Sequence, residues 1–146
     1  LGAGGAARAI VSALLEAGAP EVYISNRTRS RADQIKSDFG ARVSVVEWVK
    51  ASTEIEHTHT LVNTTSLGMT GKPALNISLQ GLRPETLVTD IVYTPLETEF
   101  LQAARSKGST VVDGLGMLIH QAVPGFERWF GQKPVVDQEI RDILIP

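Results

Sequence analysis

Leu1-Gly2-Ala3-Gly4-Gly5-Ala6-Ala7-Arg8 opens the chain and has the pattern Gly-x-Gly-x-x-Ala. This pattern is typical of a loop that begins a helix and holds the pyrophosphate of a dinucleotide. Gly2 permits a tight turn, Gly4 leaves room for phosphate beside the backbone, and Ala7 is small enough for the helix to pack closely on a sheet. The free N–H groups and positive dipole end of that helix attract an anion. Small residues at a helix start also occur for packing alone, so the pattern needs support from the rest of the chain.

Only Leu1 precedes this loop, whereas a dinucleotide-binding loop normally follows a buried strand. We therefore expect the sequence to begin where the first strand of the fold ends. We also expect the protein to have an upstream part outside these residues.

The composition is that of a single ordinary domain. The chain has 146 residues, of which 42% are hydrophobic and 21% charged, so it is long enough to bury a core. It has no run of about 18 apolar residues, which argues against a membrane-spanning helix. The net charge of −2 argues against a general nucleic-acid-binding role. The absence of cysteine excludes disulfides and cysteine-ligated zinc, and it fits a cytoplasmic enzyme.

Hydrophobic periodicity predicts strands that alternate with helices. Helices are expected over residues 5–17, 30–38, 96–107, 118–130 and 137–144, with a weak helical tendency over 47–55. Strands are expected over residues 21–25, 42–46, 60–63, 87–92 and 110–113. Pro124 is expected to kink its helix or to make the helix start anew. The alternation favours an α/β fold that is Rossmann-like and doubly wound, with a mainly parallel sheet, helices on both faces and a truncated first strand.

Three arginines follow the strand expected over residues 21–25, in Ser25-Asn26-Arg27-Thr28-Arg29-Ser30-Arg31. An NAD-binding fold places an acidic residue about 20 residues past the glycines, where it accepts the ribose hydroxyl. Here no carboxylate comes before Asp33. A guanidinium makes paired charge-assisted bonds to phosphate and stacks on adenine, so the cluster favours the 2′-phosphate of NADP. The alternative is a solvated basic loop, with Thr28 or Ser30 as the helix N-cap.

Four separated signatures together resemble the C-terminal, NADP-binding domain of the shikimate dehydrogenase family. They are Gly2-Ala3-Gly4-Gly5-Ala6-Ala7-Arg8-Ala9, Asn26-Arg27-Thr28 with Arg31, Val62-Asn63-Thr64-Thr65-Ser66-Leu67-Gly68-Met69, and Asp113-Gly114-Leu115-Gly116-Met117-Leu118 followed by Gln121. Asp90-Ile91-Val92-Tyr93 and Phe126-Glu127-Arg128-Trp129-Phe130-Gly131 agree as well. The resemblance spans nearly the whole chain and implies that residues 1–146 form an NADP-binding domain.

The resemblance implies a cofactor site built from several segments. The pyrophosphate would be held by Gly2, Ala3, Gly4, Gly5 and Ala6, and the adenosine 2′-phosphate by Asn26, Arg27, Thr28 and Arg31. Thr65 and Ser66 would line the cofactor trough, and Ile91, Gly114 and Met117 would border the nicotinamide half. Tyr93 and Gln121 would face the substrate, where both could hydrogen-bond to ring hydroxyls or a carboxylate.

The resemblance also implies a reaction, in which NADPH gives a hydride to 3-dehydroshikimate to form shikimate in aromatic amino-acid biosynthesis. In the family, a Lys and Asp pair in a separate N-terminal domain supplies the acid/base group. We expect that substrate and catalytic domain to be absent from this chain. We therefore assign no catalytic residue here and expect residues 1–146 alone to be inactive. Asp90 and Asp113, at strand ends, are expected to fix loop backbones rather than to transfer protons.

Two alternative functions stay open on the sequence. One is a non-catalytic nucleotide- or ligand-binding module of the same type, and the other is a quinate/shikimate dehydrogenase that uses NAD. The upstream sequence would separate the first from an enzyme, and the lack of an acid near Asn26 argues against the second. No metal site is expected, because His57 and His59 with Glu54 and Glu56 lie in a solvated connection.

Overall fold

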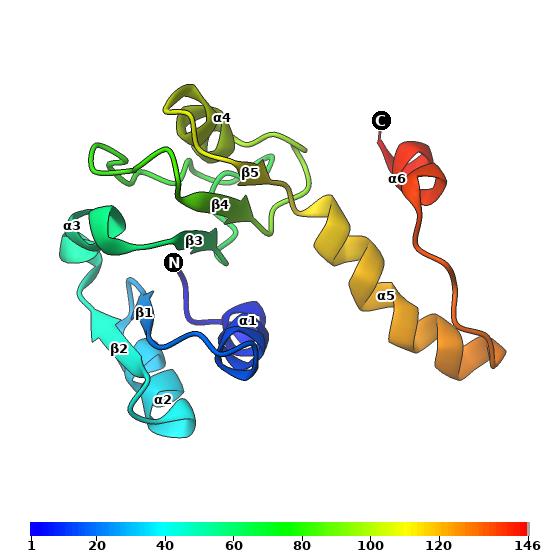
Figure 1. The fold of residues 1–146 in the computed structure, drawn as a ribbon, viewed down its shortest axis with the longest axis horizontal. Helices are drawn as coiled ribbons and strands as arrows, with labels where there is room; N and C mark the ends of the chain where they lie inside the picture. Colours follow the sequence, from blue (N-terminus) through cyan, green and yellow to red (C-terminus); the bar gives the residue numbers. More distant parts are fainter. Residues whose placement is uncertain (146) are drawn as a thin grey trace.

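The strands of the computed structural model, which describes residues 1–145, form two parallel sheets. Figure 1 shows them in the lower and upper parts of the molecule. The lower part contains α1 (Gly5–Glu16), β1 (Val22–Ser25), α2 (Arg29–Phe39) and β2 (Val43–Val46). Three short helices follow, namely η1 (Trp48–Lys50), α3 (Ala51–Glu54) and η2 (Ile55–His57). The upper part contains β3 (Thr60–Asn63), β4 (Leu87–Asp90), α4 (Glu99–Ser106) and β5 (Val111–Val112). Two helices, α5 (Leu115–Phe130) and α6 (Gln138–Leu144), follow β5 in the chain.

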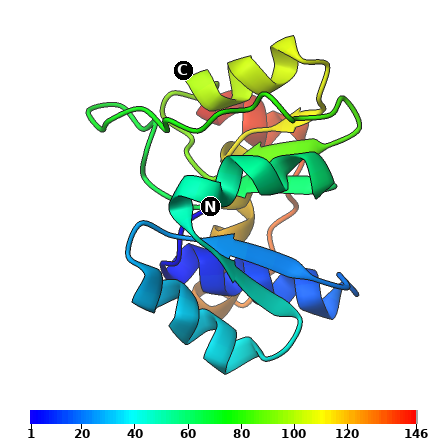
Figure 2. The same ribbon diagram turned by 90° about the vertical axis from the view of Figure 1, so that its left-hand side faces the viewer.

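All strand pairs are parallel, which confirms that expectation. In one sheet β1 pairs with β2, and in the other β4 pairs with both β3 and β5. Figure 2 shows α1 and α2 below the strands and α4 above them. The α/β fold with helices on both sides is therefore also confirmed.

Each part has its own hydrophobic core. In the lower part, one face of α1 and one face of α2 pack on the buried side of β1 and β2. This core consists of Ala7, Val11, Leu15, Ile24, Ala32, Ile35 and Val43. The upper core consists of Ile55, Leu61, Leu79, Leu82, Val88, Phe100, Leu101 and Ala104. Ala7 is 3% exposed, so its small side chain does allow the close helix packing that the motif predicts.

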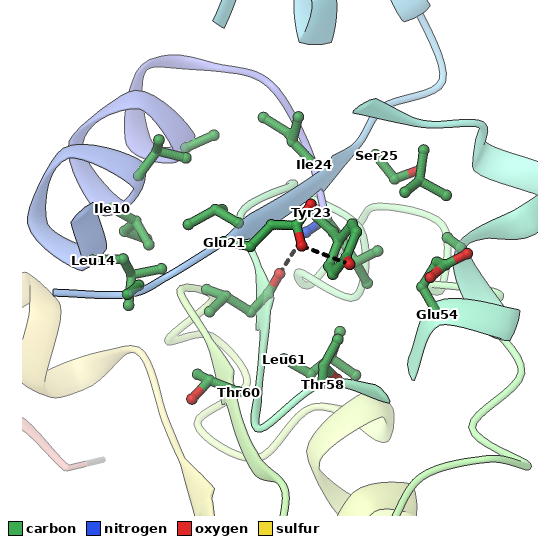
Figure 3. Close-up of a pocket in the computed structure, with 18 of the residues that line it drawn as sticks. Ile10, Leu14, Glu21, Tyr23, Ile24, Ser25, Glu54, Thr58, Thr60 and Leu61 are labelled. Carbon is green, nitrogen blue, oxygen red and sulfur yellow. Dashed lines mark hydrogen bonds between the residues drawn. The ribbon is translucent and has the colours of Figure 1, made fainter. Parts of the chain in front are cut away.

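The two parts meet at Leu1 and Gly2. The nitrogen of Leu1 donates to the carbonyl oxygen of Val62 at 2.7 Å, and the N–H of Thr64 donates to the carbonyl oxygen of Leu1 at 2.7 Å. The N–H of Gly2 donates to the carbonyl oxygen of Ser25 at 2.7 Å. This short extended piece thus lies between the ends of β1 and β3. Next to it, β1, β3 and α1 surround a slot of about 390 Å³ (Figure 3).

Two helices begin at other residues than expected, because side chains accept hydrogen bonds from N–H groups at their starts. α4 begins at Glu99 rather than at residue 96, since Thr98 is its N-cap and accepts the N–H of Leu101. α5 begins at Leu115, three residues early, where the carboxylate of Asp113 accepts the N–H of Leu115 at 3.0 Å. It runs through Pro124 as one helix, so of the two alternatives expected there, a kink or a new start, the new start does not occur. Within residues 1–145, no helix has the length and apolar character needed to cross a membrane.

Candidate functional site

A groove of about 520 Å³ lies where β1 and β3 end, between the two parts of the fold. Most residues predicted for the phosphate-binding half of the cofactor line it, namely Gly2, Ala3, Gly4, Asn26, Arg27, Thr28, Arg31, Thr65 and Ser66. Gly5 and Ala6 are not among its lining residues and form the first turn of α1 beside it. The carboxyl ends of parallel strands are the usual position for a ligand in an open α/β sheet.

Gly2 and Gly4 are required for different reasons. Gly2 has φ of 103°, and a Cβ there would lie 2.6 Å from Thr64 Oγ1, so the fold itself demands glycine. A Cβ at Gly4 would meet no atom within 4 Å, although Gly4 lines the groove. Gly4 is also the N-cap of α1, and no side chain caps that helix. The helix start is therefore open to an anion.

The three arginines after β1 do not have the same surroundings. Arg29 lies 3.3 Å from Glu47 and 3.6 Å from Asp33, and it does not line the groove. Arg27 and Arg31 are exposed and line the groove, and no side chain within residues 1–145 forms a hydrogen bond or ion pair with their guanidinium groups. These two side chains are therefore the ones available to an anionic group in the groove.

A buried polar network supports the groove from the side of β3. Asn63, Asp90 and Thr98 are all 0% exposed. Asp90 accepts from Asn63 Nδ2 at 2.9 Å, from Thr98 Oγ1 at 2.8 Å and from the N–H of Val92 at 3.0 Å. Asn63 Oδ1 in turn accepts from the N–H and the hydroxyl of Thr65 at 3.0 and 2.8 Å. The network joins the ends of β3 and β4 to the start of α4, and it holds Thr65 at the groove.

Asp90 and Asp113 both bond to backbone N–H groups, which confirms their predicted role in fixing loops. Burial raises the pKa of the Asp90 carboxyl, while the hydrogen bonds from Val92, Thr98 and Asn63 oppose that rise. Asp113 also forms an ion pair with Arg141, which ties α6 to the turn before α5.

Thr98→Val is expected to destabilise the protein by about 1–3 kcal/mol, because it leaves a buried carboxylate without one of its donors. Loss of that donor raises the pKa of Asp90 further. When the pKa of a carboxyl is raised in the folded state, the free energy of unfolding falls as the pH rises through that pKa. The loss of stability in Thr98→Val should therefore be larger at neutral pH than in mild acid. Urea unfolding of the full-length protein at both pH values measures this. Thr98→Ser keeps the hydroxyl and is the control. An equal loss of stability in Thr98→Val at both pH values would contradict the expectation.

The residues predicted for the nicotinamide and substrate lie outside this groove. Gly114 packs against the backbone after β4, where an added Cβ would lie 2.4 Å from the carbonyl oxygen of Ile91. The structure therefore brings Ile91 and Gly114 together. Met117 and Gln121 lie on α5, the former half-buried and the latter exposed, and Tyr93 is 43% exposed.

Five groove residues were not foreseen from the sequence, namely Trp48, Thr64, Leu67, Ala74 and Asn76. Thr64 and Leu67 flank predicted residues, and Trp48 follows β2 at the same sheet edge. These positions could have been found from strand order. Ala74 and Asn76 come from the long loop before β4, which has no periodic signal. Among the histidines, His57 Nε2 lies 3.1 Å from Glu56 Oε1, and the described residues contain no group of three candidate metal ligands.

Two family models match separate stretches of the chain. Residues 1–75 match the model described as shikimate / quinate 5-dehydrogenase. Residues 114–138 match the model described as the shikimate 5′-dehydrogenase C-terminal domain. The matched stretches contain the glycine loop, the arginine cluster, the Asn63 loop and the Gly114 turn.

Curated relatives and solved structures agree with these models. The chain is 60% identical over 145 residues to a shikimate dehydrogenase (NADP(+)) of Paracoccus denitrificans, and the match covers 99% of this chain and 51% of the relative. A quinate dehydrogenase of Corynebacterium glutamicum in complex with NAD has a TM-score of 0.86 and 34% identity, over 98% of this chain and 52% of that one. A shikimate 5-dehydrogenase of Thermus thermophilus in complex with NADP(H) and shikimate has a TM-score of 0.78 and 37% identity, over 92% of this chain and 49% of that one. The chain thus spans about half the length of the curated relatives it matches.

Proposed function

The chain belongs to the shikimate/quinate dehydrogenase family, and from this premise we propose that it is the NADP-binding half of a shikimate dehydrogenase. The proposal rests above all on one groove, which joins an uncapped glycine-rich helix start to two unpaired arginines. Such a groove suits a ligand with a pyrophosphate and a second phosphate. The whole enzyme would reduce 3-dehydroshikimate to shikimate, in aromatic amino-acid biosynthesis in the cytoplasm.

The residues that line the groove fit the phosphate-bearing half of NADP. Gly2 to Ala6 would hold the pyrophosphate at the start of α1, where Gly4 leaves open space. Arg27 and Arg31, with Asn26 and Thr28, would hold the 2′-phosphate. When bound as NADPH, the cofactor supplies the hydride. Ile91, Gly114 and Met117 would orient its nicotinamide end, and Tyr93 and Gln121 would bind polar groups of the substrate.

We infer that a further domain supplies the substrate site and the acid/base group, as the length of the relatives suggests. An extended segment of the polypeptide that carries this further domain would fit the slot between β1 and β3. Ile10 and Leu14 of α1, Ile24 of β1 and Leu61 of β3 line this slot (Figure 3). The exposed apolar side chains of α5 and α6 would also pack on the further domain. They include Phe126, Trp129, Phe130, Ile143 and Leu144.

Arg27→Ala is expected to weaken binding of NADP by about 1.5–3 kcal/mol and to leave binding of NAD nearly unchanged, because only NADP carries the 2′-phosphate. Calorimetric titration of full-length protein with each cofactor measures the difference. Arg29→Ala is the matched control, since its side chain is already paired with Glu47 and does not line the groove. Equal affinity of the unaltered protein for NADP and NAD would refute the cofactor assignment and favour the NAD-dependent quinate/shikimate enzyme.

Purified residues 1–146 are expected to show no dehydrogenase activity, because the acid/base group is proposed to lie in the further domain. The measurement is NADP reduction with shikimate, beside the full-length protein as the active control. Turnover by residues 1–146 would show that the acid/base group lies in this half. Binding of NADP by a full-length protein that never oxidises shikimate or quinate would instead favour the non-catalytic module.

A further inference from the structure

Trp48 is an aromatic side chain in the wall of the groove. In the parallel pair of β1 and β2, Ser25 lies opposite Val46. The residues that follow these two strands therefore leave the sheet side by side at one edge. Arg27 follows β1 there and Trp48 follows β2, and both line the groove.

The surroundings of Trp48 point to a ligand rather than to core packing. Trp48 is half-buried and belongs to neither hydrophobic core of the described residues. The preceding residue, Glu47, is held by Arg29 at 3.3 Å and by Lys50 at 3.7 Å. These ion pairs anchor the segment that carries the indole. A flat aromatic ring thus lines the same groove as the two free guanidinium groups of Arg27 and Arg31.

An indole face beside a phosphate-binding pair of arginines suits one kind of ligand group, a flat heterocycle that carries a nearby phosphate. Aromatic side chains stack on nucleobases of any kind because every base has a π-face. Adenine joined to a ribose 2′-phosphate combines these two features. We propose that the indole of Trp48 stacks on the adenine of the cofactor, a role that no sequence motif assigned to Trp48. The inference rests on the proposed binding of NADP.

The test uses full-length protein labelled with 5-fluorotryptophan and observed by fluorine NMR. The Trp48 resonance is identified by its loss in Trp48→Phe. Adenosine 2′,5′-bisphosphate, the adenine half of the cofactor, should shift this resonance, whereas nicotinamide mononucleotide should leave it in place. Trp129, which lies on α5 and does not line the groove, is the internal control and should not respond to either half.

Affinity separates stacking from simple packing. Calorimetry with adenosine 2′,5′-bisphosphate should show about tenfold weaker binding for Trp48→Ala, a loss within the range measured for base stacking. Trp48→Phe keeps a ring and should bind within about threefold of the unaltered protein, whereas Trp48→Leu keeps bulk without a π-face and should resemble Trp48→Ala.

Three results would count against the inference. A fixed Trp48 resonance at saturating adenosine 2′,5′-bisphosphate would overturn it, and so would equal affinity of the Leu and Phe variants. In both cases the nucleotide still binds, so the proposed function would survive. Failure of the unaltered protein to bind either adenosine 2′,5′-bisphosphate or NADP would overturn the proposed function together with the inference.

Discussion

Gly114→Ala should destabilise the protein by about 3 kcal/mol, near the upper end of what overpacking costs. The added Cβ would lie 2.4 Å from the carbonyl oxygen of Ile91 and 2.6 Å from that of Val92. Both contacts are with backbone, so no side chain can rotate away to relieve them. Either the turn before α5 or the chain after β4 has to move, and both carry residues proposed to border the nicotinamide. Cofactor binding should therefore weaken as well.

Urea unfolding and calorimetric titration with NADP measure the two effects of Gly114→Ala. Gly116→Ala is the matched control, two residues further along in α5, because its added Cβ would meet no atom within 4 Å. Alanine in a helix should raise stability there by about 0.5–1 kcal/mol. If Gly114→Ala were as stable as the unaltered protein, the close packing of Gly114 on the Ile91 backbone would be refuted.

Gly2→Ala should be about as damaging as Gly114→Ala, since it combines two costs. The φ of 103° is unfavourable for any residue with a Cβ, and that Cβ would lie 2.6 Å from Thr64 Oγ1 and 2.9 Å from Thr65 Cγ2. We expect a loss of about 2–4 kcal/mol from strain and overpacking together. Because Gly2 and Thr64 join the two parts of the fold, the groove should lose its shape and its affinity for NADP.

Two other glycines separate the causes at Gly2. Gly18 has φ of 91° but open space around it, so Gly18→Ala should cost only the backbone strain. Gly4→Ala should leave stability almost unchanged and still weaken NADP binding, because the methyl group would enter space that the phosphate needs. If Gly2→Ala lowered the free energy of unfolding no more than Gly18→Ala, the close contact with Thr64 would contribute nothing to the loss of stability.

The alternation of helices and strands was predictable because it depends on local apolar spacing. β3 was expected over residues 60–63 and lies there, and α1 begins at the expected residue and ends one residue early. Helix starts were harder, since Thr98 and Asp113 act through hydrogen bonds to N–H groups further along the chain. Periodicity carries no signal for such bonds. The split into two sheets joined at Leu1 and Gly2 was not predicted either, because pairing between distant strands leaves no local mark.

Some features of the candidate site were likewise predictable from the sequence, and others were not. Residue types within eight positions of one another were enough to predict a phosphate-binding loop and a basic cluster, because their chemistry depends on near neighbours. The family resemblance already pointed to Arg27 and Arg31 rather than Arg29, but only the tertiary structure gave the physical reason, since Glu47, which follows α2 and β2 in the chain, pairs with Arg29. Likewise, Asn63, Asp90 and Thr98 form one buried network although 35 positions separate the first from the last. Charge pairing and burial depend on distance in space, which the order of residues along a chain does not contain.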